Sequence, residues 1–147
     1  MGPYRPITIL LIEDNPDHAE LTQRALEAGN MMNQIFWVKD GEEALDYLFR
    51  RATYADPARA PRPGLILLDV KLPKVDGHKV LKQIKEDSEL QTIPVVMLTT
   101  SEREDEVHEA FKAGANSWVT KPVKFAEFME KITAIKLYWM LTNRLPC

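Results

Sequence analysis

The chain alternates between short apolar runs and longer segments in which apolar residues recur about every 3.6 positions. Three of the runs, at residues 7–12, 65–68 and 93–98, are almost continuously apolar. A strand that is covered on both faces of a parallel sheet has no polar face, so these runs predict buried parallel strands. Weaker strands are predicted at Gln34–Val38 and at residues 117–119.

Five other segments carry the apolar stripe of an amphipathic helix. Asn15 before a proline is typical of a helix cap followed by a first-turn proline. Capping-box spacing indicates two further helix starts, at Asp40 with Glu43 and at Ser101 with Glu104. The residues expected on the buried stripes are Leu21, Ala25, Ala28; Leu45, Leu48, Phe49; Val80, Leu81, Ile84; Val107, Ala110, Phe111; and Phe128, Ile132, Ile135.

This repeated alternation of strand and helix predicts a single α/β domain with a doubly wound parallel sheet. For five strands, the flavodoxin-like order 2-1-3-4-5 is the natural arrangement. The core spans about residues 7–135, and residues 51–64, with several prolines and arginines, predict a long surface loop. Residues 136–147 predict a helical extension that is apolar on every side around positions 137–141.

Composition narrows the class of protein. The 147 residues are 45% hydrophobic and 28% charged, which is typical of a globular domain. A net charge of −3 without a basic stripe argues against nucleic acid, and no apolar run is long enough for a membrane span. We therefore expect a cytoplasmic protein, since the amino-terminal residues also lack a signal peptide. The single cysteine, Cys147, excludes an internal disulfide.

Polar residues stand where the predicted strands end. Glu13-Asp14 follow the first strand, Asp69 the third, Thr99 the fourth and Lys121 the fifth. The carboxyl ends of parallel strands meet at one edge, where open α/β folds bind ligands. Two carboxylates ~5 Å apart repel by about 3 kcal/mol at an effective dielectric of 20, so a cation such as Mg²⁺ is expected beside them. A carboxylate with Mg²⁺, a lysine and a hydroxyl suits phosphoryl transfer, with Asp69 as the candidate nucleophile.

Four motifs occur in order around these positions. They are Ile-Glu-Asp-Asn at 12–15, Leu-Leu-Asp-Val-Lys-Leu-Pro at 67–73 followed by Asp76-Gly77, Leu-Thr-Thr-Ser at 98–101, and Gly-Ala-Asn-Ser-Trp-Val-Thr-Lys-Pro at 114–122. Over residues 7–135 the chain resembles the receiver domain of two-component response regulators.

The resemblance implies a chemical role for each strand-end residue. Asp69 would accept a phosphoryl group from a sensor histidine kinase. Mg²⁺ would be held by Asp14, Asp69 and the backbone carbonyl of Lys71, while Glu13 acts through a metal-bound water. Lys121 would pair with the phosphoryl and carboxylate oxygens.

The same resemblance implies a switch and residues that tune the lifetime of the phosphoryl group. Thr99 would move inward to bond the phosphoryl group. The aromatic switch position falls on Trp118, where the family more often has tyrosine or phenylalanine. Lys71 and Ser101 occupy positions that tune the lifetime, and a cis bond is expected between Lys121 and Pro122.

No effector domain is expected after the receiver, so we expect output through protein contacts rather than turnover of an external substrate. The loop at 51–64 and the extension resemble single-domain regulators that work with bacterial phytochrome histidine kinases. The extension also suggests a homodimer through the fourth helix, the fifth strand, the fifth helix and the tail, with Trp139 in the interface.

Three other interpretations remain open. A receiver-fold scaffold would bind partners without phosphorylation. An aspartyl-phosphate phosphatase would usually need a second aspartate where Lys71 stands. A flavin mononucleotide carrier is disfavoured because Glu13-Asp14 would repel the phosphate. The histidines, at positions 18, 78 and 108, lack ligand spacing and are interpreted as packing or solvated residues.

Overall fold

The computed structural model describes residues 4–5, 7–28, 33–100, 104–121, 123–134 and 145–146. Seven strands, five α-helices and two short 3-10 helices lie in this part of the chain. In chain order they are β1 (Tyr4–Arg5), β2 (Thr8–Ile12), α1 (Pro16–Ala28), β3 (Gln34–Val38), α2 (Gly41–Leu48), η1 (Ala52–Tyr54), η2 (Pro57–Arg59), β4 (Leu65–Asp69), α3 (Gly77–Glu86), β5 (Val95–Thr99), α4 (Glu104–Lys112), β6 (Ser117–Thr120), α5 (Phe125–Ala134) and β7 (Leu145–Pro146).

Five strands form a parallel sheet in the order β3-β2-β4-β5-β6. Counted along this sheet's own strands, the order is 2-1-3-4-5, so the predicted fold class is confirmed. β5 begins at Val95, two residues later than the apolar run suggested. Pro94 has no N–H for the ladder, although its carbonyl accepts a hydrogen bond from Ile66 N at 3.0 Å.

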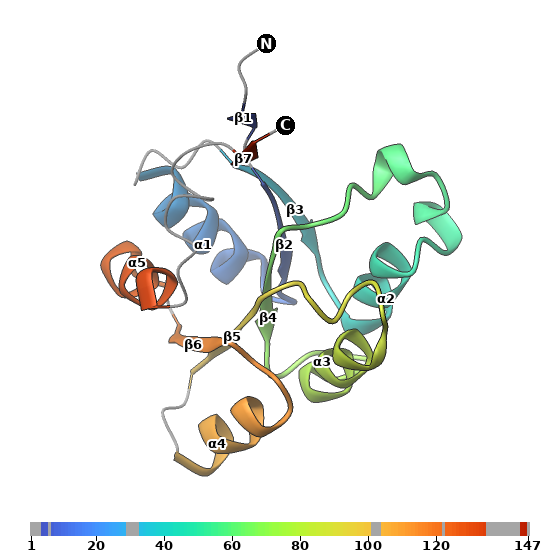
Figure 1. Ribbon diagram of the computed structural model, residues 1–147. Helices are drawn as coiled ribbons and strands as arrows, with labels where there is room; N and C mark the ends of the chain where they lie inside the picture. Colours follow the sequence, from blue (N-terminus) through green and yellow to red (C-terminus); the bar gives the residue numbers. More distant parts are fainter. Residues whose placement is uncertain are drawn as a thin grey trace.

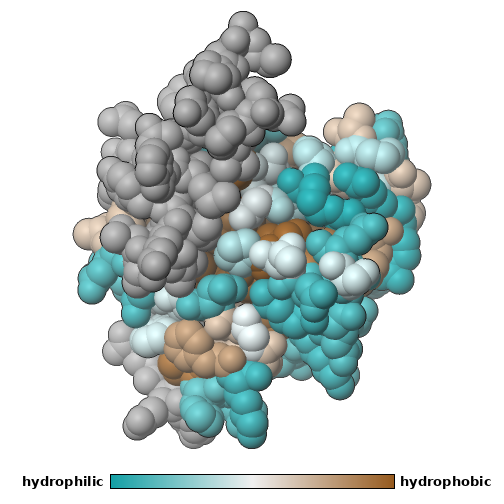
Figure 2. Space-filling model, viewed as in Figure 1, coloured by the Kyte–Doolittle hydropathy of each residue, from teal (hydrophilic) through white to brown (hydrophobic). Residues whose placement is uncertain are grey.

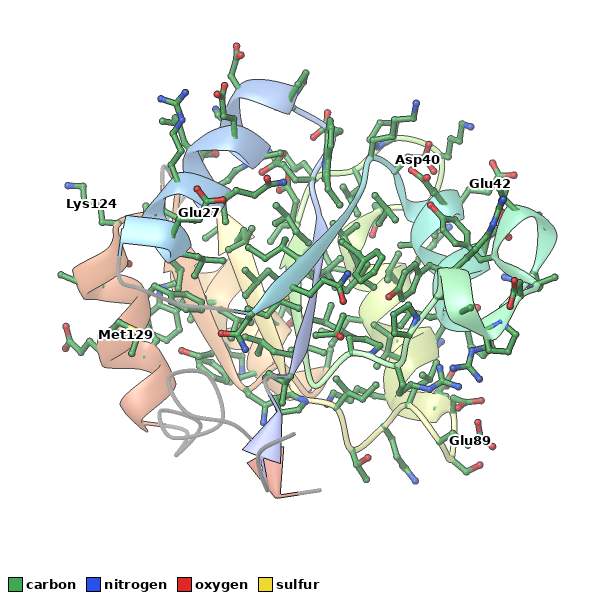
Figure 3. All side chains as sticks on the ribbon, turned by 90° about the horizontal axis from the view of Figure 1, so that it is seen from above. Glu27, Asp40, Glu42, Glu89, Lys124 and Met129 are labelled. Atoms are coloured by element: carbon green, nitrogen blue, oxygen red, sulfur yellow. The ribbon has the colours of Figure 1, made fainter. Side chains whose placement is uncertain are left out.

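Helices cover both faces of the sheet (Figure 1). Because side chains alternate along a strand, β2 sends Ile9 and Leu11 toward one apolar cluster and Leu10 and Ile12 toward the other. The first cluster includes residues of α1 and α5, and the second includes residues of α2, α3 and α4. In Figure 3, Asp40 and Glu42 at the start of α2 lie across the sheet from Met129 on α5.

The prediction for the buried face of α1 is wrong at Leu21, whereas Ala25 packs against the core as predicted. The helix buries Ala19, Thr22 and Leu26, while the side chain of Leu21 is 47% exposed. A polar threonine is tolerated on the buried face because its hydroxyl donates to the carbonyl of His18 at 2.9 Å. Apolar periodicity could not reveal that a local hydrogen bond satisfies this hydroxyl.

The long connection between α2 and β4 is more ordered than a simple surface loop. We call residues 49–64 the α2–β4 loop; it contains η1 and η2, and most of its residues are exposed. Ala60 is nevertheless only 1% exposed. The loop is tied to α2 because Tyr47 Oη donates to Pro61 O at 2.7 Å and Arg62 Nη1 donates to Leu48 O at 2.8 Å.

The helical prediction for residues 136–147 is wrong at the positions that the structure describes. Leu145 and Pro146 form β7, which pairs antiparallel with β1, beside it in Figure 1. Pairing between distant segments is a tertiary contact that local apolar character does not reveal. Residues 135–144, with Trp139, lie outside the described residues. Among the helices described, none is long and apolar enough to cross a membrane.

Candidate functional site

The carboxyl ends of β2, β4, β5 and β6 bring four predicted site residues together. Glu13 directly follows β2, Asp69 and Thr99 end β4 and β5, and Lys121 directly follows β6. The backbone N–H of Lys121 donates to the carbonyl of Thr99 at 2.7 Å, so the lysine is held against the neighbouring strand end. The residues that the sequence placed at the strand ends therefore lie close together in the structure.

Lys121 forms a bridge between two buried carboxylates. Its Nζ lies 2.8 Å from Glu13 Oε1 and 3.0 Å from Asp69 Oδ2. All three side chains are almost excluded from solvent, with exposures of 6% for Lys121, 0% for Glu13 and 6% for Asp69. Charge-assisted bonds of this length between desolvated groups hold both carboxylates in fixed orientations.

Asp14 completes a group that we call the carboxylate cluster, formed by Glu13, Asp14 and Asp69. One oxygen from each residue lies within 4.8 Å of the others, and Asp14 is the exposed member. Three carboxylates against one lysine leave an excess of negative charge. An all-oxygen donor set with such an excess fits a hard divalent cation such as Mg²⁺.

The local sequence fixes this geometry at both flanking loops. Asn15 caps α1, because its Oδ1 accepts from the backbone N–H groups of Asp17 at 2.9 Å and His18 at 3.3 Å. Asp76 caps α3 in the same way. Gly77 follows it because a Cβ there would lie 2.2 Å from the carbonyl oxygen of Asp69. The glycine thus lets α3 begin directly against the strand that carries Asp69.

Burial perturbs the ionisation of the cluster. Desolvation raises the pKa of Glu13 to about 7, with a further contribution from Asp69, although the hydrogen bond from Lys121 acts in the opposite direction. Burial lowers the pKa of Lys121, but hydrogen bonds and attraction from Glu13 and Asp69 outweigh it, so the net shift is upward. Lys121 therefore remains a cation, while the ionised form of Glu13 is costly unless another cation approaches.

A cavity of about 200 Å³ opens onto this cluster, and we call it the strand-end cavity. The cavity is large enough for a small anionic group beside a metal ion. Its lining consists of Asp14, Asn15, His18, Asp69, Val70, Lys71, Thr99, Thr100 and Lys121.

Of the remaining predicted site residues, Lys71 belongs to the wall of this cavity, Trp118 lies apart from it, and Ser101 lies outside the described residues. Lys71 lines the cavity and its backbone N–H donates to Asp69 Oδ1 at 3.2 Å. Trp118 instead lies beside α4, with its ring centroid 5.3 Å from that of Phe111, and Lys131 Nζ lies 3.6 Å from the Trp118 ring centroid. Ser101 and Pro122 lie outside the described residues, so the lifetime position and the cis bond stay predictions.

Sequence reasoning missed two residues of this region. Trp37, on the edge strand β3, donates from its indole Nε1 to the backbone carbonyl of Glu13 at 2.7 Å. The backbone N–H of Glu13 donates in turn to Val38 O at 3.0 Å, so residues of β3 bind both the N–H and the carbonyl of Glu13. No spacing signal marks Trp37. His18, interpreted from sequence as a packing or solvated residue, lines the strand-end cavity; its nearness to the acidic pair was the available signal.

Two curated relatives match most of the chain. It is 45% identical over 141 residues to the probable methanogenesis regulatory protein FilR2 of Methanothrix harundinacea, covering 96% of this chain and 88% of the relative. It is 36% identical to the response regulator Rcp1 of Synechocystis sp., covering 96% of this chain and 94% of Rcp1.

Solved structures agree with this match. The bacteriophytochrome response regulator AtBRR superimposes with a TM-score of 0.83 at 42% identity, covering 95% of this chain and 99% of that one. The Mn²⁺-bound form of Rcp1 gives a TM-score of 0.76 at 36% identity, covering 97% of this chain and 100% of that one. The phosphorylated cyanobacterial phytochrome response regulator RcpA gives 0.77 at 38%, covering 97% and 99%.

The family described as "Response regulator receiver domain" matches residues 9–133. These residues include the whole carboxylate cluster and, apart from Thr8, all five strands of the parallel sheet. The fold, the strand-end chemistry and the relatives agree, and the chain belongs to the response regulator receiver domain family.

Proposed function

We propose that this protein is a single-domain response regulator that accepts a phosphoryl group on Asp69 from a sensor histidine kinase, in a reaction that needs Mg²⁺. One observation carries the proposal. The Asp69 carboxylate lies 3.0 Å from Lys121 Nζ, and one of its oxygens lies within 4.8 Å of oxygens from Glu13 and Asp14. These groups lie at the carboxyl ends of the parallel strands. This edge of the sheet is where open α/β folds bind ligands.

Each residue of the site has a defined task in such a transfer. In the reaction, an Asp69 oxygen forms a bond to phosphorus as the bond from phosphorus to the kinase histidine breaks. Asp14, Asp69 and the carbonyl of Lys71 would hold the metal, with Glu13 acting through a bound water. The metal supplies positive charge for the transferring oxygens. Lys121 supplies a second charge and Thr99 a hydroxyl donor.

Two related structures support the metal and the phosphoryl group as ligands. Rcp1 has been solved with Mn²⁺ bound, and RcpA has been solved in a phosphorylated form. The chain covers 99% of AtBRR and 100% of the solved Rcp1 chain, so the likeness extends over nearly the whole of both regulators. A cytoplasmic location goes with this proposal, because a kinase needs ATP.

The first experiment measures intact mass after incubation with a small phosphodonor, with Mg²⁺ or with a chelator. Wild type is expected to gain one phosphoryl group only with the metal. Asp69→Asn should gain none, because the nucleophilic oxygen is replaced. Asp46→Asn is the matched control: the same chemical change on α2, where Asp46 contacts Arg51 at 3.7 Å. It should behave as wild type.

Failure has a clear meaning. Absence of an adduct both with the phosphodonor and with purified histidine kinases would overturn the proposal in favour of a phosphorylation-independent scaffold. Continuous release of inorganic phosphate from external phosphoesters would favour a phosphatase. Lys71, two residues after Asp69, is an exposed lysine rather than a second aspartate, which argues against that outcome.

The partner kinase is proposed to be a bacterial phytochrome. Support comes from AtBRR and RcpA, whose names state a phytochrome connection, whereas FilR2 is named for methanogenesis regulation. Radiolabel transfer from a phytochrome kinase and from unrelated histidine kinases would decide the matter. We expect faster transfer from the phytochrome kinase, and equal rates would contradict this part of the proposal.

A homodimer through α4, β6 and α5 completes the proposal. Support comes from Phe111 on α4, which is 43% exposed and whose ring centroid lies 5.3 Å from that of Trp118 on β6. Figure 2 also shows an apolar surface at the lower left, the side of the molecule on which α4 lies in Figure 1. A second copy of this chain would cover the surface through a two-fold interface. Light scattering should give twice the monomer mass for wild type and the monomer mass for Phe111→Glu. A monomeric wild type would contradict the dimer.

A further inference from the structure

His18 lies beside the site but has no task in the proposed phosphoryl transfer. It lies in the first turn of α1 and lines the strand-end cavity together with Asp69, Lys71 and Lys121. We propose that the imidazole of His18 is a binding residue of this site, and that its Nδ1 hydrogen-bonds to the oxygen shell of the loaded site. This shell consists of the phosphoryl oxygens and the waters bound to the metal. The inference rests on the proposed function.

The backbone of His18 is fixed by two side chains. Asn15 Oδ1 accepts from the His18 N–H at 3.3 Å, and Thr22 Oγ1 donates to the His18 carbonyl at 2.9 Å. The N–H of Asn15 in turn donates to Glu13 Oε2 at 3.2 Å. The histidine is thus attached to the same capped turn that positions the acidic pair, so its backbone has a defined place beside the cavity.

The ring carries a polar atom that the protein leaves unsatisfied. Nδ1 of His18 is buried, and within the described part of the chain it has no hydrogen-bond partner. Leaving a buried polar atom unpaired is unfavourable, and buried polar atoms in proteins are paired in the great majority of cases. His18 lines the strand-end cavity, and a rotation of its ring on ligand binding would give the buried Nδ1 a partner in that cavity.

Two other side chains of the wall, Lys121 and Asp69, have partners already. Lys121 Nζ is bound to Glu13 and Asp69, and Asp69 Oδ1 accepts from the backbone of Lys71. A neutral imidazole can donate or accept at Nδ1, depending on its tautomer, so it can bond either a phosphoryl oxygen or a water. The contact therefore needs no change in the charge of His18.

Three variants test the inference. His18→Leu keeps a similar volume and removes the ring nitrogens, whereas His18→Asn keeps a polar atom near the place of Nδ1. His108→Leu is the matched control, because His108 is an exposed residue of α4 that does not line the cavity. Two affinities are measured for each protein: Mn²⁺ alone, and beryllofluoride with Mg²⁺ as a phosphoryl mimic.

Loss of one hydrogen bond to a charged ligand predicts beryllofluoride binding about tenfold weaker in His18→Leu. His18→Asn should stay within about threefold of wild type, and His108→Leu should match wild type. If Mn²⁺ binding weakens as well, Nδ1 contacts a metal-bound water; if only beryllofluoride binding weakens, it contacts the phosphoryl oxygens.

Thermal unfolding without metal separates binding from packing. His18→Leu should melt at the same temperature as wild type or a few degrees higher, because it removes the unsatisfied buried atom. A lower melting temperature, with equal losses of affinity in His18→Leu and His18→Asn, would show a packing role and overturn the inference. Unchanged affinities in His18→Leu would also overturn it.

The experiment distinguishes this failure from failure of the proposed function. Wild type must bind beryllofluoride with Mg²⁺, and Asp69→Asn must not. If wild type itself fails to bind, the proposed function is contradicted. If wild type binds and His18→Leu binds equally well, only the assignment of His18 is wrong.

Discussion

The strand-end cavity and the α2–β4 loop differ in how far their polar groups are satisfied by hydrogen bonds within the protein. In the loop and its anchor helix, side chains are used to satisfy backbone carbonyls: Tyr47 bonds Pro61, Arg62 bonds Leu48, and Arg50 bonds Ala60. At the cavity, two of the three clustered carboxylates, Glu13 and Asp69, share one lysine, and His18 Nδ1 has no partner among the described residues.

The same chain thus separates a segment that serves stability from a segment that serves binding. Satisfied polar groups rigidify a surface segment and leave nothing for a ligand to complete. An excess of like charge at a cavity destabilises the isolated protein, and a cation or a donor can remove that cost on binding.

Lys121→Met should produce the largest change. It removes the cation bound to two carboxylates that are 0% and 6% exposed, and breaking a buried charge pair costs about 3 kcal/mol of unfolding free energy. Urea unfolding at about pH 8 with a chelator measures this loss, and added Mg²⁺ should restore part of it. Phosphoryl acceptance should be lost.

Lys124→Met is the control for this experiment, because Lys124 lies exposed on the surface next to α5 (Figure 3). It should change the unfolding free energy by less than about 0.5 kcal/mol. A loss in Lys121→Met no larger than in the control would mean that the lysine does not offset the buried carboxylates.

The pKa of Glu13 predicts the next largest effect. Since burial raises it from 4.5 to about 7 in the folded protein, the folded state binds more protons than the unfolded state between these values. Stability of the metal-free protein should therefore fall as pH rises through this range. Glu13→Gln should flatten the profile and stabilise the metal-free protein at about pH 8 by roughly 2 kcal/mol.

Urea unfolding at several pH values measures both effects. A profile for Glu13→Gln that still falls as steeply as that of wild type would assign the proton to another group. Saturating Mg²⁺ should also flatten the wild-type profile, because a bound cation favours the ionised carboxylate.

Tyr47→Phe tests the satisfied region. The variant keeps the ring, which is 1% exposed, and removes the 2.7 Å hydrogen bond to Pro61 O, so about 1 kcal/mol of stability should be lost. Mn²⁺ affinity and phosphoryl acceptance should match wild type. A weaker metal affinity in Tyr47→Phe would show that the loop and the cavity are coupled. It would contradict the view that the loop serves stability alone.

Trp37→Phe should have the smallest effect. It removes the indole N–H that donates to Glu13 O at 2.7 Å and keeps most of the aromatic surface. Because the bond holds the peptide beside Asp14, Mn²⁺ affinity should fall by about threefold, with less than about 1 kcal/mol of stability lost. Trp118→Phe, on the α4 side of the sheet, is the control and should leave Mn²⁺ affinity unchanged.

Much of the architecture could be predicted from local patterns. Three continuous apolar runs and two weaker strand signals identified the five strands of the parallel sheet, and the caps at Asn15 and Asp40 are present. Local capping bonds and buried strands depend on neighbouring residues, which the sequence displays directly. The buried face of α1 could not be predicted in this way, because it depends on a hydroxyl of Thr22 that a turn of the same helix satisfies.

The gathering of polar residues at the strand ends could be deduced from the sequence alone, since parallel strands with polar residues after them must bring those residues to one edge. Only the tertiary structure decided how the groups share their charges, with Lys121 bound to Glu13 and Asp69 rather than free in the cavity. It also decided that Trp37 holds the Glu13 carbonyl and that β7 pairs with β1. These contacts join residues far apart in the chain, and their burial and direction depend on packing that no local pattern records.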